Sequence, residues 1–172
     1  MIPVGVYTHI NVAFAVLDPT SFEVKPLSSS DPTNYKKITD LKKQDPNLKV
    51  FIAIGGGEFS QSTKTSDVFP RLVAADAKQQ QAFFDNLLAF MSKYNFDGVD
   101  LDWEYPVNPE RDGKSSAEKN NFSTFVASLN DYLKKNGKSN SVSMAIPSPP
   151  YYLRDGYDFP ALVSGMIIRS ET

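Results

Sequence analysis

The sequence predicts an α/β fold in which parallel strands alternate with helices. Apolar runs of strand length alternate with amphipathic stretches along the 172 residues, and this order is typical of strands joined by right-handed helical crossovers. Glycines or acidic residues directly follow two of the strands, which is where parallel α/β folds place their chemistry. No linker-like segment interrupts the pattern, so residues 1–172 are expected to form a single domain.

Four strands are expected where apolar and β-branched residues run together between turn residues. They cover Tyr7 to Val16, Val50 to Ile54, Val99 to Trp103 and Ser141 to Ile146. The tail of the chain holds a candidate short helix at Phe159 to Val163 and a candidate fifth strand in the apolar run from Met166 to Ile168.

Three amphipathic helices are expected between these strands. A short one covers Asn34 to Gln44, and a polar loop is expected between the glycines that follow Ile54 and the next helix. That second helix is long, starts after a capping Asp76 and ends at Asn95. The third starts at Ser115-Ser116-Ala117-Glu118, which has capping-box spacing, and ends at Gly137. The core is expected to contain the helix aromatics Phe83, Phe84, Phe122 and Phe125.

The composition excludes several classes of function. A net charge of −2 provides no basic surface for nucleic acid, and no apolar run approaches the roughly 18 residues of a membrane helix. The absence of cysteine rules out disulfides, thiolate metal sites and a cysteine nucleophile. The first residues lack the basic and apolar regions of a secretory signal, so none is expected. The only histidine, His9, is expected to be a packed strand residue.

The acidic residues of the third strand are the strongest functional signal. Alternate side chains share one face of a strand, so Asp100, Asp102 and Glu104 are expected to lie together while the apolar residues between them face the core. Because three neighbouring carboxylates cannot all ionise freely, the pKa of at least one must rise. A raised pKa suits a general acid near neutral pH. A magnesium or calcium site is the main alternative, and a solvated edge strand is a weaker one.

The same residues carry a resemblance to a known family. The run Asp97-Gly98-Val99-Asp100-Leu101-Asp102-Trp103-Glu104-Tyr105-Pro106 resembles the D-G-x-D-x-D-W-E-Y-P signature of glycoside hydrolase family 18, the chitinases. Thr8 to Ala15 is similar to the family's second barrel strand, and Ala53-Ile54-Gly55-Gly56 is similar to its third-strand motif. The resemblance extends from about residue 1 to about residue 160 and looks closest to fungal-type members.

The resemblance implies a partial (β/α)8 TIM barrel, covering about strands two to five and the start of six. It implies retaining hydrolysis of β-1,4-linked N-acetylglucosamine polymers, in which the substrate's own acetamido oxygen is the nucleophile. Glu104 would be the general acid and then the base, Asp102 would bind the acetamido N–H, and Asp100 would share a proton with Asp102. No metal or cofactor is expected. The sugar subsites would be lined by Gly55, Gly56, Gly57 and Tyr105.

The chain departs from the family pattern chiefly in length. A complete barrel takes about 250 residues, so the chain is expected to be a fragment without the family's first strand, its sixth-strand M-x-Y-D segment and its last-strand tryptophan. Gly57 stands where the family has a tryptophan, and Ala53 stands where many members have a serine. Unpaired strand edges in such a fragment would invite association.

Three functions therefore stay open. The first is hydrolysis of chitin or chito-oligosaccharides, and family members of this kind are usually secreted. The second is non-catalytic chitin binding by an inactive barrel fragment, and the third is an endo-β-N-acetylglucosaminidase of the same family. Tyr151 and Tyr152 follow the fourth strand and are equally compatible with sugar stacking and with loop packing.

Overall fold

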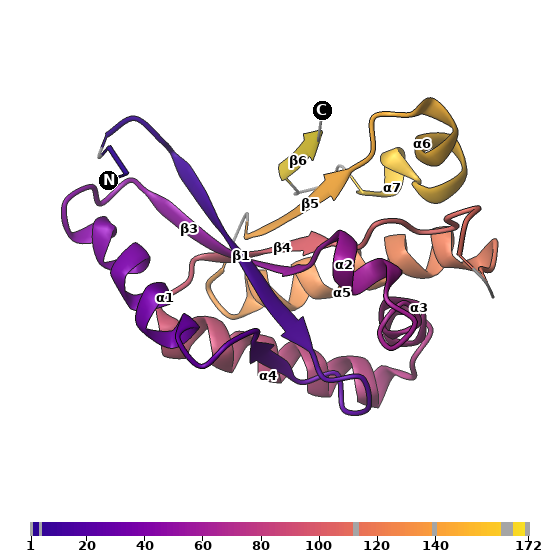
Figure 1. Cartoon of the computed structure of the whole chain (residues 1–172), viewed down its shortest axis with the longest axis horizontal. Helices are drawn as coiled ribbons and strands as arrows, with labels where there is room; N and C mark the ends of the chain where they lie inside the picture. The colour runs from indigo at the N-terminus through magenta and orange to yellow at the C-terminus, as the bar shows by residue number, and fades with distance from the viewer. Residues whose placement is uncertain (1, 4, 112–113, 139–140, 163–166, 171–172) are drawn as a thin grey trace.

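The computed structural model describes residues 2–3, 5–111, 114–138, 141–162 and 167–170 (Figure 1). Six strands form one sheet in the order β2-β1-β3-β4-β5-β6. The strands are β1 (His9–Leu17), β2 (Val24–Pro26), β3 (Lys49–Gly55), β4 (Gly98–Asp102), β5 (Val142–Ile146) and β6 (Ile167–Ser170). The helices are α1 (Asp31–Thr39), η1 (Asp40–Lys43), α2 (Gly57–Gln61), α3 (Val68–Val73), α4 (Ala77–Tyr94), α5 (Ala117–Lys135), α6 (Pro150–Gly156) and α7 (Phe159–Leu162).

The sheet is parallel from β1 to β6, which confirms the predicted fold class. The short strand β2 is the exception and pairs antiparallel with the end of β1, from Ala15 to Leu17. The sequence did not predict β2, and its pairing means that this edge of β1 is partly covered. The candidate fifth strand is β6, although its predicted first residue, Met166, lies outside the described residues.

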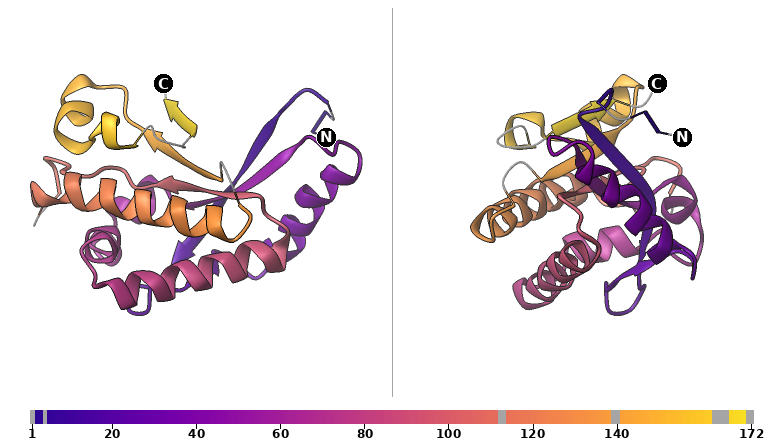
Figure 2. Two further views of the ribbon diagram at one scale, coloured as in Figure 1. Left: turned by 180° about the vertical axis from the view of Figure 1, so that it is seen from behind. Right: turned by 90° about the vertical axis from the view of Figure 1, so that its left-hand side faces the viewer.

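The main core lies between one face of the sheet and the helices α1, α4 and α5, which the views from behind and from the side place on the same side (Figure 2). Strand residues that point to this side are fully buried because helices cover them. They include Val50, Ile52, Ile54, Val99, Leu101, Val142 and Met144, and the predicted helix aromatics Phe83, Phe84, Phe122 and Phe125 pack with them.

Helix α4 begins and ends at its predicted signals, and α5 ends at its predicted glycine, while at the start of α5 only the Glu118 half of the predicted capping box forms. The Asp76 side chain accepts a hydrogen bond from Gln79 N at 2.8 Å at the start of α4, and Asn95 ends this helix in a left-handed conformation. At the end of α5, Gly137 has φ +79°. The N–H groups of Gly137 and Lys138 donate to the carbonyls of Lys134 and Leu133, which is a Schellman cap.

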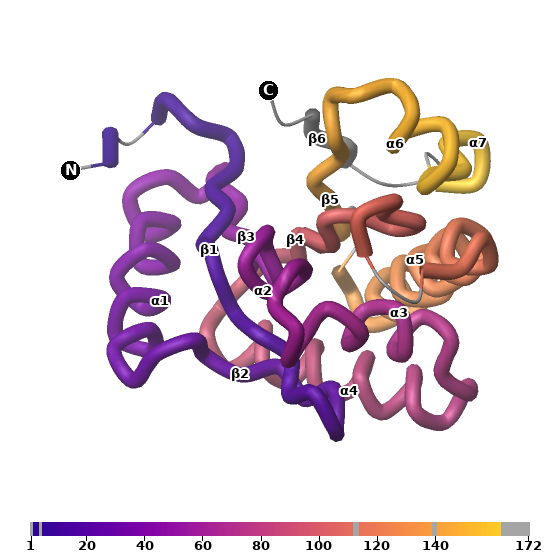
Figure 3. The backbone as a smooth tube through the Cα atoms, turned by 45° about the vertical axis from the view of Figure 1, so that its right-hand side comes forward, coloured from indigo at the N-terminus to yellow at the C-terminus, as the bar shows by residue number. Residues whose placement is uncertain are grey.

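The prediction of a polar loop between β3 and α4 is wrong, because this segment contains the two short helices α2 and α3 (Figure 3). Helix α3 buries Val68, Phe69, Leu72 and Val73 against the core. These two helices have only 5 and 6 residues, which is too short for helical periodicity to stand out from the polar residues around them. The first helix also begins earlier than predicted, at Asp31, and continues from Asp40 as a 3₁₀ turn.

Candidate active site

The acidic side chains lie at the carboxyl end of β4, in the middle of the sheet. Asp100 pairs in register with Ala53 of β3 and with Ser143 of β5, and Asp102 pairs with Gly55. Both aspartates are only 5% exposed. The Ser143 hydroxyl donates a hydrogen bond to Asp100 Oδ1. The aspartates are therefore held on a central strand, with small residues on both sides of Asp100 and with Gly55 beside Asp102.

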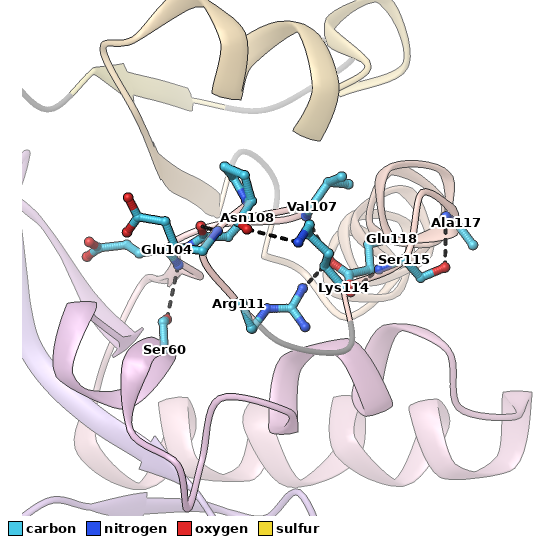
Figure 4. Close-up of polar contacts among 11 residues, drawn as sticks. Ser60, Glu104, Val107, Asn108, Arg111, Lys114, Ser115, Ala117 and Glu118 are labelled. Atoms are coloured by element: carbon cyan, nitrogen blue, oxygen red, sulfur yellow. Dashed lines mark hydrogen bonds and ion pairs between the residues drawn. The ribbon is translucent and has the colours of Figure 1, made fainter.

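Glu104 lies two residues beyond the end of β4, so the predicted strand to Trp103 is slightly too long. The peptide bond from Glu104 to Tyr105 is cis. The main-chain N–H of Glu104 donates to Ser60 Oγ at 3.0 Å, and Ser60 Oγ lies 3.5 Å from Asp102 O, to which it donates. Ser60 of α2 therefore holds the backbone on both sides of Trp103, and Figure 4 shows its contact with Glu104. No sequence pattern indicates Ser60, because 44 residues separate it from Glu104.

The glycines at the end of β3 and directly after it let this backbone approach β4 closely. Gly55 has φ +110°, and a Cβ built on it would lie 2.4 Å from Asp102 O. Gly56 donates its N–H to the same carbonyl at 2.9 Å. A Cβ on Gly57 would lie 3.3 Å from Glu104 Oε2. The predicted glycines thus lie directly against Asp102 and Glu104.

Two pockets adjoin the residues that contact Glu104. One, of about 440 Å³, is mostly apolar and includes Gly57 in its lining. The other, of about 480 Å³, is polar and includes Ser60. The first is lined by Phe14, Val16, Leu17, Pro19, Leu27, Gly55, Gly56, Gly57, Glu58, Phe59, Ser62, Lys64 and Thr65. The second is lined by Ser60, Gln61, Thr63, Ser66, Asn108, Glu110 and Arg111.

Trp103 points to the opposite side of the chain from the acidic residues, as its place in the alternation predicts. It is 1% exposed. Its ring stacks on Phe69 of α3 with centroids 5.8 Å apart and contacts Phe122 of α5 edge-on. Arg111 lies over the indole, with its guanidinium carbon 5.9 Å from the ring centroid. Trp103 therefore anchors the start of the segment that carries Glu104 in the core.

Tyr105 contacts α6, the helix that follows β5. Its ring centroid lies 5.2 Å from that of Tyr152, which in turn lies 4.5 Å from that of Tyr151. Tyr151 is 49% exposed, and burial raises the pKa of Tyr152 above its ordinary value. Close packing of Gly156 on Pro106 O brings the end of α6 to the same segment. The three tyrosines thus form one aromatic cluster beside Glu104.

Asp97 lies away from the other carboxylates, just before β4. Its Oδ2 accepts hydrogen bonds from Val50 N at 2.8 Å and from Lys42 Nζ at 2.9 Å. In the described part of the chain, no three His, Asp or Glu side chains are arranged to hold a metal ion. Within those same residues, no helix is long and apolar enough to cross a membrane.

Comparison with known proteins gives a consistent picture. The sequence pattern of the Glycosyl hydrolases family 18 matches residues 1–166. The chain is 31% identical over 164 residues to an endochitinase of Manduca sexta, covering 94% of this chain and 28% of that protein. It is 36% identical over 160 residues to a probable chitinase 10 of Drosophila melanogaster, covering 90% of this chain and 7% of that protein.

Solved structures agree with the sequence relatives. Catalytic domain 2 of the Group II chitinase of Ostrinia furnacalis superposes with a TM-score of 0.88 and 29% identity, over 99% of this chain and 44% of that one. A mutant of the same domain was solved in complex with (NAG)5. The open sheet is therefore part of a TIM barrel, as predicted, and the chain spans less than half the length of these relatives. The closer resemblance to fungal-type members of the family stays a prediction.

Proposed function

Because the chain belongs to family 18 of the glycosyl hydrolases, we propose that this protein hydrolyses β-1,4 linkages between N-acetylglucosamine units of chitin. The observation that carries this proposal is the position of Glu104, at the end of the central strand and against the Gly57 backbone. A carboxyl group on a backbone held there can reach a glycosidic oxygen from one side. Glu104 itself lines neither pocket, but Gly57 and Ser60, which adjoin it, line one pocket each, and both pockets have the volume expected of ligand sites, about 300 to 1,000 Å³.

In the proposed reaction, Glu104 protonates the leaving glycosidic oxygen as the bond to the anomeric carbon breaks. The carbonyl oxygen of the substrate's acetamido group attacks that carbon and forms an oxazolinium ion. Glu104, now a carboxylate, then takes a proton from the water that opens this ring, so the product keeps its configuration. The carboxyl group is restored to its starting protonation state.

The aspartates would support the acetamido group during this step. Asp102, two residues before Glu104, would accept the acetamido N–H and offset the positive charge of the oxazolinium ion. Asp100 lies deeper and accepts a hydrogen bond from Ser143, so it would hold Asp102 rather than contact sugar. Gly55, Gly56 and Gly57 would let the sugar approach the backbone, and Tyr105 would border the subsite near α6.

The experiment compares chitopentaose with cellopentaose, which has a hydroxyl in place of each acetamido group. The initial products are followed by NMR, which distinguishes the two anomers before they interconvert. The proposal expects cleavage of chitopentaose with retained configuration and no cleavage of cellopentaose. Inverted products, or equal cleavage of both sugars, would contradict it.

A second candidate is chitin binding without hydrolysis. In the described residues the sheet is open, with β2 and β6 as its two edge strands. The chain also covers only 44% of the solved relative. Both observations favour binding without hydrolysis. Binding of chitopentaose without release of products would support this candidate. An N-glycan substrate in the same assay separates chitinase from endo-β-N-acetylglucosaminidase activity.

A further inference from the structure

We propose that Arg111 and Glu118 form a positioning pair that holds the backbone around Glu104 in place. The inference rests on the proposed function for its effect on the reaction. Neither residue belongs to β4 or to the glycine turn. Glu118 lies in the first turn of α5, and Arg111 lies in the segment that connects β4 to α5.

The pair is buried, and the burial of two charged groups is an inefficient way to stabilise a fold. The side chains of Arg111 and Glu118 are 9% and 5% exposed, and Arg111 Nη2 donates to Glu118 Oε2. Removing two charges from water is strongly unfavourable, and apolar residues of similar size often stabilise a fold equally well. A buried pair next to a candidate active site therefore calls for a role in positioning.

Glu118 connects the start of α5 to the chain just past Glu104. Its Oε2 accepts a hydrogen bond from Val107 N at 2.7 Å, and its Oε1 accepts one from Ser115 N at 3.1 Å. Val107 is only three residues beyond Glu104. In Figure 4 the carboxylate lies between Val107 and the end of Arg111. The Glu118 side chain thus connects the residues that follow Glu104 to the long helix α5.

Arg111 contacts the residue that comes directly before Glu104. Its guanidinium lies over the ring of Trp103, the residue directly before Glu104. The indole therefore contacts both the guanidinium that is paired with Glu118 and the ring of Phe69. The pair therefore contacts the chain both before and after Glu104, while Ser60 holds its N–H.

This arrangement predicts a specific kinetic effect. Catalytic groups must be held within about 0.5 Å of their productive position, and a displacement of about 1 Å can lower a rate about 100-fold. Glu118 is in the lining of neither pocket, whereas Arg111 lines the polar one. Glu118→Gln should therefore lower kcat by about 10- to 100-fold and leave KM within about twofold. Arg111→Met should lower kcat by a similar factor and also raise KM, because it changes the pocket lining.

The test uses Glu118→Gln and Arg111→Met, with Arg111→Lys as the conservative variant. Asp131→Asn is the matched control, because Asp131 is an exposed carboxylate on the same helix. The first readout is the split between kcat and KM on chitopentaose, and Arg111→Lys should recover part of the lost kcat. Unchanged kcat in folded Glu118→Gln and Arg111→Met proteins would overturn the proposal, as would equal losses in Asp131→Asn.

A second readout does not depend on turnover and separates this proposal from the proposed function. Amide hydrogen exchange at Val107 should accelerate by about tenfold or more in Glu118→Gln, since the neutral amide oxygen of glutamine is a weaker hydrogen-bond acceptor than the charged carboxylate. The fluorescence of Trp103, the only tryptophan, should shift in Arg111→Met. If the parent protein has no hydrolytic activity, the proposed function fails, while unchanged exchange and fluorescence would overturn the positioning pair.

Discussion

Gly57 lies directly against the carboxyl group of Glu104, so that a single added carbon would touch it. A Cβ at Gly57 would lie 3.3 Å from Glu104 Oε2, closer than such contacts normally are. The glycine turn and the acidic strand, which are separate motifs in the sequence, therefore form one site. The backbone of α2 defines one wall of the space around the proposed proton donor.

Gly57→Ala tests this contact, because it should raise stability while it lowers activity. Gly57 is the first residue of α2, so alanine should stabilise the fold by up to about 1 kcal/mol. The added methyl should displace the Glu104 carboxyl and lower kcat by about two- to tenfold. Steady-state kinetics on chitopentaose and urea unfolding measure the two effects. An unchanged kcat would mean that the contact has no influence on the reaction.

Gly55→Ala should be strongly destabilising. Its Cβ would lie 2.4 Å from the carbonyl oxygen of Asp102 on the neighbouring strand, and φ is +110°. The clash and the backbone strain together should lower the free energy of unfolding by about 3 kcal/mol. Gly137→Ala is the control, because φ there is +79° but nothing lies within 4 Å of the added carbon. It should cost only about 1 kcal/mol, and equal losses at both positions would refute the clash.

The hydrogen bond between Tyr132 and Asp85 should make stability depend on alkaline pH. The Tyr132 hydroxyl, on α5, donates to Asp85 Oδ1 of α4 at 2.5 Å. Burial, helped by Asp85, raises the pKa of Tyr132 from 10.0 to about 12. The folded protein thus holds this proton more tightly than the unfolded chain. Its stabilisation is complete below pH 10 and is lost as the pH rises to about 12.

Tyr132→Phe measures that stabilisation. The variant should lose about 1 kcal/mol of unfolding free energy at neutral pH, and the difference from the parent protein should shrink above pH 10. Urea unfolding at a series of pH values measures it. Tyr7→Phe, at a tyrosine that is 52% exposed, should leave the whole profile unchanged. If the stability difference between Tyr132→Phe and the parent protein grew as the pH rose, the raised pKa of Tyr132 would be contradicted.

Local patterns in the sequence predicted the parallel strands, the long helices and the placement of the acidic residues. On β4, the apolar residues Val99 and Leu101 are fully buried, and the alternation alone is enough to place Asp100 and Asp102 on the other face. The caps at Asp76 and Gly137 are equally local. Each of these signals depends on neighbours within a few residues along the chain.

Contacts between distant parts of the chain could not be predicted in this way. Ser60 meets Glu104 across 44 residues, and α2 and α3 are too short for their periodicity to be detected. Glu118 was expected only as a capping residue, and it does accept a hydrogen bond from Ser115 N. Its second oxygen binds Val107 and Arg111, and no sequence spacing indicates that contact.

The central claim is that Glu104 is the proton donor, and the most direct test is Glu104→Gln. The measurement is the initial rate of chitopentaose hydrolysis by the parent protein and by this variant, with binding of the sugar measured alongside. Removing a general acid should lower the rate by about 10²- to 10⁴-fold, while the sugar still binds. Equal rates in the two proteins would contradict the assignment of Glu104.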